Sequence, residues 1–492
     1  MQKKRQLKIL YNALYNEETI SIQEMPRSGS YREYYRISGG SGRSVVGVYN
    51  EDRKENIAFL SFSRHFRAHG LAVPEILAED LDNNIYLQED LGDLTLYEYL
   101  TSVYKNGIFP QPLIDIYKSV LGELPKFQLG AAKTLDYSKC YPRFRFDRQS
   151  IMWDLNYFKY YFLKLARISF DEQELENDFN RFADFLLETE TDFFMYRDFQ
   201  SRNIMLKDEK PYFIDYQGGR YGALQYDVAS LLYDAKADIP QHIRDSLFEY
   251  YLDVLSAYQK VDRKAFTKYY HAYVLVRILQ AMGAYGFRGF YEKKQHFLKS
   301  VPYAVENIAY LLDVMDLPIK IPALTSVLKK ITVTERLMKY GRTDSDKLTL
   351  DISSFSYKRG IPDDTSGNGG GFVFDCRGIL NPGRYEEYKD LNGKDKAVQD
   401  FLRSKTDIDG FIAHAVAMVE PTVDNYVRRK FTHLMVGFGC TGGQHRSVYC
   451  ALQFPIILKV ARILLYGLII FEKEKKIKVN KRKNRGREQI NK

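Results

Sequence analysis

Two short segments, residues 195–206 (MYRDFQSRNIML) and 212–217 (YFIDYQ), constrain this chain more than any other feature. They place Asp198, Asn203 and Asp215 in the order that phosphoryl transfer uses: a base for a hydroxyl group, then two oxygen ligands for Mg²⁺. An Asp followed five residues later by an Asn is common by chance. The apolar run 212–214 before Asp215, however, is typical of a carboxylate at the end of a strand. The two segments therefore predict a kinase active site.

The composition is that of a large globular protein with reduced cysteines. At 492 residues the chain is long enough for about three domains. Its four cysteines, Cys140, Cys376, Cys440 and Cys450, have no paired spacing, which argues against a disulfide framework. The basic N-terminus is not followed by the apolar core and small-residue cleavage site of a signal peptide. We therefore expect a cytoplasmic protein.

The formal charge of +9 is concentrated at one end of the chain. Residues 472–492 contain ten Lys and Arg against three Glu, so the rest of the chain is nearly neutral. A basic tail can bind RNA or anionic lipid, although most such tails are simply solvated. RNA is a possible partner that we do not expect.

The first ninety residues predict a lobe that could hold a nucleotide. Residues 1–24 have helical spacing, and residues 27–37 and 45–49 predict a hairpin whose turn could lay backbone N–H groups over phosphates. An ordinary hairpin is the alternative. The second strand contains no Lys, so the helix predicted near residues 55–69 has no obvious ion-pair partner. Phosphate contact would then come from the backbone or from Arg32.

Residues 85–92 change from apolar to acidic, as expected for a hinge whose backbone at Gln88 to Asp90 could bond an adenine edge. Residues 93–190 are mainly helical by pattern and rich in aromatic residues. Among these, the polar residues Arg143, Arg148 and Asp154 could face an acceptor pocket. Asp227, near the start of the next helix, suits a helix cap and also a tie to the magnesium loop; capping is the more expected role.

The first part of the chain resembles the aminoglycoside phosphotransferase and choline kinase superfamily, which has a two-lobed protein-kinase-like fold. The segments 196–203, 214–217 and 226–232 and the helix from residue 277 are most similar to the anomeric kinases of N-acetylmuramic acid and N-acetylglucosamine. Such kinases phosphorylate the C1 hydroxyl. Two departures are Tyr196, which stands where a His is usual, and the absent strand Lys, which the sugar-kinase relatives also tend to lack.

This resemblance implies ATP and Mg²⁺ as cofactors, with Asp198 as catalytic base and Asn203 and Asp215 as metal ligands. The nucleotide-binding residues that we expect are Ser28, Gly29, Ser30, Tyr31, Arg32, Gln88, Glu89 and Asp90.

Residues 348–450 have a different sequence pattern from the preceding part of the chain. Strand-like runs at 348–356, 372–377 and 433–438 alternate with loops, and the last run leads into the small-residue loop 439–447. A strand, such a loop and a helix form an anion-binding arrangement. Cys440 and Arg446 also have the spacing of tyrosine-phosphatase loops, in which a thiolate attacks phosphate. Phosphate binding without chemistry is the preferred interpretation, and a purely structural glycine turn remains open.

This region closely resembles the C-terminal domain of the RapZ-type RNase adapter proteins, through residues 353–362, 374–377, 391–395 and 439–448. That family domain binds an amino-sugar phosphate, so the resemblance implies a phosphosugar sensor. The usual N-terminal P-loop domain of that family is missing here. The implied ligand residues are Lys358, Arg359, Arg377, Cys440, Gly442, Gly443, Gln444, His445 and Arg446.

The end of the chain departs from that family, because residues 452–471 are apolar and a basic tail follows. A membrane span is possible but not expected, since Lys459 and Arg462 would each cost about 2.5 to 3.5 kcal/mol near the bilayer centre. A frame-altered or truncated C-terminus is the other interpretation.

Together these features predict an α+β two-lobed protein-kinase-like fold followed by a smaller α/β phosphate-binding domain. The expected boundaries are 1–90 for the N-lobe, 91–330 for the helical C-lobe, 331–347 for a linker, 348–471 for the RapZ-like domain and 472–492 for the tail. The predicted function is Mg·ATP-dependent phosphorylation of a small-molecule sugar, with a phosphosugar ligand at the second domain. The alternatives are a kinase for an aminoglycoside, choline or homoserine, and an RNA-linked regulatory protein that senses nucleotide and phosphosugar.

Overall fold

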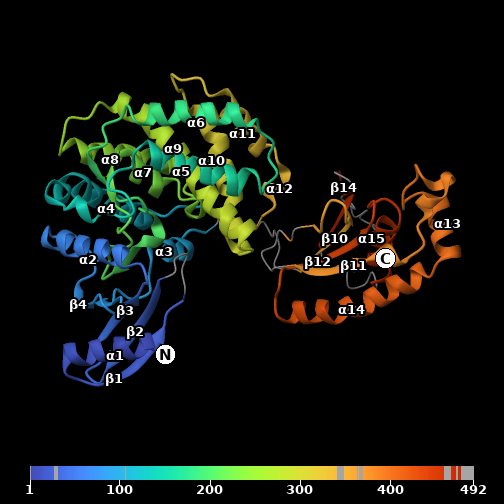
Figure 1. The fold of residues 1–492 in the computed structure, drawn as a ribbon, viewed down its shortest axis with the longest axis horizontal. Coiled ribbons are helices and arrows are strands. Elements are labelled where there is room, and N and C mark those ends of the chain that lie inside the picture. Colours follow the sequence, from blue (N-terminus) through green and yellow to red (C-terminus); the bar gives the residue numbers. More distant parts are fainter. Residues whose placement is uncertain are drawn as a thin grey trace, which may run out of the picture. The chain divides into compact units, whose positions relative to one another are not determined.

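The computed structural model describes residues 2–26, 32–105, 107–340, 348–362, 364, 370–458, 467–472 and 475–477. The chain divides into two compact units (Figure 1). The first comprises Met1–Phe287 and Ser300–Leu337, and the second Arg288–Lys299 and Met338–Lys492. Within these described ranges, no helix is both long and apolar enough to cross a membrane.

The N-terminal lobe of the first unit is a five-stranded antiparallel sheet with the order β1-β2-β3-β5-β4. Its strands are β1 (Thr19–Glu24), β2 (Glu33–Gly39), β3 (Ser44–Tyr49), β4 (Ile76–Asp80) and β5 (Ile85–Glu89). The helix predicted over residues 1–24 ends early, as α1 (Gln2–Tyr15), because Asn16 adopts a left-handed conformation and the β-branched residues after it form β1. α1 buries Leu7 and Tyr11 in a core with strand residues of this sheet.

One long helix crosses this lobe, and its start is fixed by a cap. α2 (Arg53–Ala68) is preceded by Asp52, whose carboxylate accepts hydrogen bonds from the backbone N–H groups of Lys54 and Glu55. Its apolar face, which includes Phe59, Phe62 and Phe66, is buried. Glu55, in the first turn, accepts a 2.7 Å hydrogen bond from the Asn50 side chain.

The larger lobe of the first unit is helical (Figure 1). Its helices are α3 (Leu96–Val103), α4 (Gln111–Pro125), α5 (Arg148–Tyr157), α6 (Glu172–Leu186), α7 (Gln225–Leu232), α8 (Gln241–Ser256), α9 (Arg263–Gly286), α10 (Val301–Val314) and α11 (Pro322–Thr332). α9 lies at the centre and packs on α5, α7 and α10. It approaches the segment 157–162 closely because Gly286 lacks a side chain: a Cβ there would lie 2.1 Å from the Tyr161 carbonyl oxygen. The short helix α12 (Glu335–Met338) lies in the segment predicted as a linker, of which residues 341–347 are outside the described ranges.

Two small two-stranded antiparallel sheets hold the loops that carry the predicted catalytic residues. β6 (Phe193–Met195) pairs with β9 (Arg220–Gly222), and β7 (Ile204–Lys207) pairs with β8 (Lys210–Phe213). The loop 196–203 therefore connects β6 to β7, and the segment 214–219 connects β8 to β9. As predicted, Asp215 follows the end of a strand.

The second unit contains a mainly parallel sheet with the order β11-β12-β10-β13-β14. Its strands are β10 (Thr349–Ser356), β11 (Gly371–Asp375), β12 (His433–Cys440), β13 (Gly467–Glu472) and β14 (Lys475–Ile477), and only the β13–β14 pair is antiparallel. Every residue of β12 is buried, as expected for a central strand. The helices are α13 (Lys396–Lys405), α14 (Ile408–Arg428) and α15 (Arg446–Ile457). The α+β first unit and the smaller α/β second unit confirm the predicted fold class.

The apolar segment 452–471 is divided between two elements of this unit. Its first part completes α15, which ends at Ile457, and its last part forms β13 beside β10. The residues between them, 459–466, are outside the described ranges. Residues 467–472 therefore join the sheet as a strand.

Candidate active site and anion-binding loop

A buried carboxylate, that of Asp227, fixes the loop that carries Asp198 through hydrogen bonds to the loop backbone. Asp227, on α7, accepts hydrogen bonds from the backbone N–H groups of Tyr196 and Arg197, at 2.9 and 3.0 Å, and from Gln128 at 3.1 Å. Burial raises the pKa of Asp227 to about 7. The expected helix-capping role is wrong, since the side chain bonds the catalytic loop and the cap residue of α7 is Leu224.

Arg197 fixes the same loop from the side. Its guanidinium donates two hydrogen bonds to the Asp154 carboxylate, at 2.8 and 2.9 Å, and both side chains are largely buried. Asp154 was expected to face an acceptor, and the structure instead pairs it with the residue next to Asp198. The carboxylate of Asp198 is 42% exposed, so the loop presents it to solvent while its neighbours are held.

Tyr196, which stands where a His is usual, has a structural partner. It is fully buried, and its hydroxyl donates a 2.6 Å hydrogen bond to the backbone carbonyl of Ile214. Ile214 directly precedes Asp215. The tyrosine therefore connects the loop of Asp198 to the segment of Asp215.

Asn203 and Asp215, the two predicted metal ligands, lie side by side. The Asn203 amide nitrogen donates to the Asp198 carbonyl at 2.9 Å and to the Asp215 carboxylate at 3.1 Å, and Gln217 donates to the other Asp215 oxygen at 2.7 Å. Asp215 has φ +70°. Burial and the nearby Asp198 carboxylate raise the pKa of Asp215, so a cation would stabilise its charged form.

These residues fit a hard divalent cation. A carboxylate and an amide oxygen are the ligands that Mg²⁺ prefers, and Mg²⁺ typically uses few protein ligands together with phosphate oxygens. Asn203 would supply its oxygen by turning its amide group, whose orientation is assigned from hydrogen bonding. Across the described ranges, no three His, Cys, Asp or Glu residues cluster as a self-contained metal site.

A buried arginine, Arg32, lies beside Glu55 of α2. It is 3% exposed, lies 3.6 Å from the Glu55 carboxylate and donates to the Tyr86 hydroxyl at 3.4 Å. Nearby Tyr86, Glu55 and Asp215 raise the pKa of Arg32, although burial opposes this. The expectation that α2 lacks an ion-pair partner is therefore wrong. The other residues predicted for this turn, Ser28, Gly29, Ser30 and Tyr31, lie outside the described ranges.

Side chains of the expected hinge residues form ion pairs with other residues of the protein. Asp90 accepts a two-point ion pair from Arg36, at 2.7 and 3.0 Å, and Glu89 pairs with Lys207 at 2.8 Å. Gln88 is buried. Gln88 and Glu89 lie in β5, whose backbone pairs with β3 and β4, so bonding of an adenine edge by the backbone of residues 88–90 stays a prediction.

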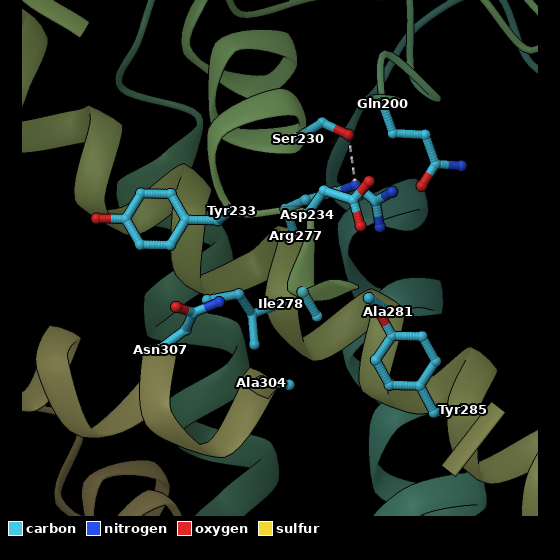
Figure 2. Close-up of a pocket in the computed structure, with 11 residues that line it drawn as sticks. Gln200, Ser230, Tyr233, Asp234, Arg277, Ile278, Ala281, Tyr285, Ala304 and Asn307 are labelled. Carbon is cyan, nitrogen blue, oxygen red and sulfur yellow. Dashed lines mark hydrogen bonds between the residues drawn. The ribbon is translucent and has the colours of Figure 1, made fainter. Parts of the chain in front are cut away.

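A small hollow lies among the helices of the larger lobe (Figure 2), and one of its lining residues, Arg277, lies close to Asp198. It is lined mainly by hydrogen-bonding residues, including Gln200, Ser230, Arg277 and Asn307. The Arg277 guanidinium donates to the Ser230 hydroxyl at 2.9 Å, the contact drawn in Figure 2, and lies 3.9 Å from the Asp198 carboxylate. The hollow holds little more than one water molecule, so an acceptor would rest over it and against Asp198.

Sequence reasoning placed Arg143 and Arg148 as acceptor candidates and gave no role to Arg277. Arg143 and Arg148 form ion pairs with Asp147 and Asp184 instead. Arg277 is a single basic residue within an apolar helical run, and this was the signal that could have identified it. A cation in an otherwise buried helix face requires a polar partner nearby.

In the second unit, the loop 441–445 connects β12 to α15 and surrounds a thiol. The Cys440 sulfur lies 3.1 Å from the Ser447 hydroxyl. Although burial opposes it, hydrogen bonds from Ser447 and from the backbone N–H groups of Gly443 and Gln444 lower the pKa of Cys440. Gly443 has φ +65°, and a Cβ there would lie 2.9 Å from the Ser356 backbone nitrogen.

The nine ligand residues predicted for the second unit fall into two groups in the structure. Gln444, His445 and Arg446 bond backbone carbonyls of the segment 377–391, at 2.6 to 3.0 Å, and so hold the loop in place. The remaining residues leave the loop accessible: Lys358, Arg359, Gly442 and Arg377 are exposed, Gly443 is half-buried and Cys440 lies beneath it.

A thiolate phosphatase would need a free arginine and a protonated acid. Arg446 is bonded to the carbonyls of Arg377 and Ile379, and Arg377 forms a two-point ion pair with Asp375 that lowers the Asp375 pKa. The arrangement therefore favours binding of an anion over transfer of one.

Two family models match the chain in the regions just described. The phosphotransferase enzyme family matches residues 22–262, and the RapZ C-terminal domain matches residues 348–462. The chain joins a phosphotransferase-family domain to a RapZ C-terminal domain. Both predicted resemblances are thus confirmed at the level of the family.

Curated relatives match only part of this chain. A "Nucleotide-binding protein" of Dinoroseobacter shibae is 39% identical over 24% of this chain and 37% of its own length, and one of Fusobacterium nucleatum is 28% identical over 38% of this chain and 63% of its own length. The chain therefore spans less than two thirds of these relatives.

Solved structures similar to the chain include phosphotransferases. A choline kinase from Streptococcus pneumoniae is 13% identical with a TM-score of 0.42, covering 63% of this chain and 100% of that chain. An ADP-bound aminoglycoside phosphotransferase is 12% identical with a TM-score of 0.40, covering 63% of this chain and 98% of that chain.

Proposed function

We propose that the phosphotransferase-family domain transfers the terminal phosphate of ATP to the anomeric hydroxyl of an N-acetylated amino sugar. The observation that carries this proposal is the arrangement of Asp198, Asn203 and Asp215: Asn203 donates hydrogen bonds to the Asp198 backbone carbonyl and to the Asp215 carboxylate, and the segments that carry them are held by Asp227 and Tyr196. Such preorganisation is what phosphoryl transfer requires, because most of its acceleration comes from positioning and electrostatics.

In this proposal each residue has a defined task. Asp198 accepts the proton of the attacking hydroxyl, and Arg277, 3.9 Å away, orients the carboxylate. Mg²⁺, held by Asn203 and Asp215, would neutralise charge on the phosphates when bound. Arg32, positioned by Glu55, faces the same region from the N-terminal lobe and would contact the nucleotide phosphates.

The hollow offers groups that suit a sugar. Its wall presents Gln200, Ser230 and the Arg277 guanidinium, which bind hydroxyl and carbonyl oxygens. The hollow is also lined by Asp234, Tyr233 and Tyr285, and a carboxylate and aromatic faces are the groups that bind a cationic acceptor such as choline. The wall therefore suits an amino sugar, and the assay below decides between a sugar and a cationic acceptor.

The position of phosphorylation gives a direct test. A kinase acting at the anomeric carbon removes the reducing end of its sugar, whereas a kinase acting at any other hydroxyl leaves it. We expect ATP consumption with N-acetylglucosamine or N-acetylmuramic acid to match the loss of reducing ends one for one. ATP consumption with no loss of reducing ends would contradict the anomeric assignment, and turnover of choline alone would contradict the sugar assignment.

We further propose that the RapZ C-terminal domain binds a sugar phosphate. The support is the loop 441–445 before α15, where backbone N–H groups and the exposed Lys358 and Arg359 can receive an anion. Isothermal titration of the full chain with glucosamine 6-phosphate tests this, with glucosamine as control. Equal binding of both sugars would contradict a phosphate-directed site.

The alternative is an RNA-linked regulatory protein whose first domain only senses nucleotide. The basic segment 472–492 motivates it. A gel shift with and without this segment separates the two accounts, since binding that depends on the tail alone disappears with it and is strongly salt dependent. Salt-resistant RNA binding without the tail would favour the alternative.

A further inference from the structure

A second hollow of about 230 Å³ lies among the helices of the C-terminal lobe. Its walls come from α8, α9 and α10, with Arg244, Asp245 and Phe248 on α8, Tyr270 on α9 and Tyr310 on α10. It includes no residue of the loops 196–203 and 214–219. It shares only Tyr233 with the hollow shown in Figure 2. The space is far larger than the roughly 30 Å³ that a water molecule occupies.

Arg244 is a buried cation without an acidic partner. It is 7% exposed, and no carboxylate lies within ion-pair distance of it among the residues that the structure describes. One guanidinium nitrogen donates to the Asn307 side-chain oxygen at 2.7 Å and to Gln241 at 3.4 Å, while its Nε is buried with no hydrogen-bond partner there. A buried charge is costly unless it is paired, so this arrangement calls for an anion.

The other walls are suited to a flat or apolar body. Phe248 and Tyr270 stack with ring centroids 4.0 Å apart, and the Tyr270 hydroxyl is likewise buried without a partner in the described part of the chain. The Arg244 guanidinium lies 4.5 Å over the ring of Tyr233. Because these ring faces are partly covered by each other and by Arg244, the rings form an apolar wall against which a planar or aliphatic body can pack.

The acidic residues at this hollow already have partners within the protein. Glu249 pairs with Arg263 at 2.7 Å, and Asp245 accepts a 2.7 Å hydrogen bond from Gln241. Burial lowers the pKa of His271, so its imidazole is neutral near pH 7 and adds no charge. An incoming anion would therefore be attracted by Arg244 and repelled by Asp245.

We propose that this hollow is a binding site for a small organic anion, a carboxylate or phosphate carried on a flat body, separate from the acceptor hollow. The anion completes the coordination of the Arg244 guanidinium, and its body lies against Tyr233, Phe248 and Tyr270. Arg244 also holds Asn307, which lines the acceptor hollow (Figure 2). Occupation of this site therefore changes acceptor binding through Asn307 and Tyr233.

Isothermal titration of the full chain with benzoate, phenyl phosphate and inorganic phosphate tests the site without requiring any catalytic activity. We expect saturable binding of benzoate or phenyl phosphate that Arg244→Gln weakens at least tenfold and Asp245→Asn strengthens, because the two variants remove opposite charges. Arg181→Gln, an exposed arginine of α6, is the control and should bind as the wild type does. Tighter binding of inorganic phosphate than of the flat anions would overturn the role of the aromatic walls.

Three further outcomes would overturn the proposal: no saturable binding of any probe, equal binding in the Arg244 and Asp245 variants, or displacement of the probe by the acceptor in direct competition. If Arg244→Gln does not fold, as shown by its thermal transition, the predicted gain in Asp245→Asn still decides the question. Because the readout is binding, failure of the proposed kinase activity does not alter it.

Discussion

The hydrogen bond of Tyr196 gives the sharpest quantitative prediction for the catalytic loop. Tyr196→Phe removes one buried 2.6 Å bond to the Ile214 carbonyl and changes no side-chain shape. Leaving that carbonyl unsatisfied costs about 1 to 3 kcal/mol. Because this bond connects the loops of Asp198 and Asp215, part of that energy maintains the catalytic geometry. A loss of 1.4 kcal/mol in the transition state corresponds to about a tenfold lower kcat/KM.

The matched control is Tyr273→Phe, which removes a buried hydrogen bond from a tyrosine hydroxyl to the Leu186 carbonyl, at 2.9 Å, away from both loops. Denaturant unfolding should show a similar loss of stability in both variants, while steady-state kinetics should show the loss of kcat/KM only in Tyr196→Phe. If both variants unfold equally easily and neither loses activity, the tyrosine is a packing residue and the reasoning fails.

Three further predictions follow from the two units. Burial raises the pKa of Asp227 to about 7, above the roughly 4 of an unfolded chain, so the native state holds the extra proton between these values. Its contribution to the unfolding free energy should be largest below pH 4 and fall by up to about 1.4 kcal/mol per pH unit as the pH rises to 7, a slope that denaturation of Asp227→Asn should lack. Arg32→Met should weaken binding of Mg·ATP at least tenfold in a fluorescence titration, whereas Arg64→Met, which breaks an exposed ion pair with Glu79, should not. Gly443→Ala should abolish sugar-phosphate binding by the RapZ C-terminal domain, because its φ is positive and its Cβ would meet Ser356, whereas Gly442→Ala, with open space, should bind normally in the same titration.

Secondary-structure elements could be predicted from the sequence where a local residue pattern is sufficient to define them. The segments around Asp198 and Asp215 combine a polar motif with a flanking apolar run, so the strand before Asp215 and the order of the site residues could be predicted, whereas the β6–β9 and β7–β8 pairings were not. Three strands of the second domain, β10, β11 and β12, could also be predicted, because a buried central strand such as β12 is a continuous apolar run, whereas β13 and β14 were not predicted.

The partners of these residues could not be predicted, because they depend on contacts between distant segments. Arg32 meets Glu55 across the N-terminal lobe, and Asp227 reaches the backbone of Tyr196 and not its own helix. Sequence spacing does not encode either contact, and the local rule of helix capping gave the wrong role for Asp227. The position of Arg277 beside Asp198 likewise follows from the packing of α9 on α7.

The central claim is that Asp198 serves as the base of a sugar kinase, and Asp198→Asn tests it most directly. The measurement is turnover of Mg·ATP with a panel of N-acetylated amino sugars and amino alcohols, beside nucleotide binding by the same protein. We predict that the variant binds Mg·ATP as the wild type does and loses turnover of the sugars, while Asp253→Asn, at an exposed ion pair with Arg263, retains it. Turnover retained by Asp198→Asn, or a wild type that phosphorylates none of the panel, would contradict the account.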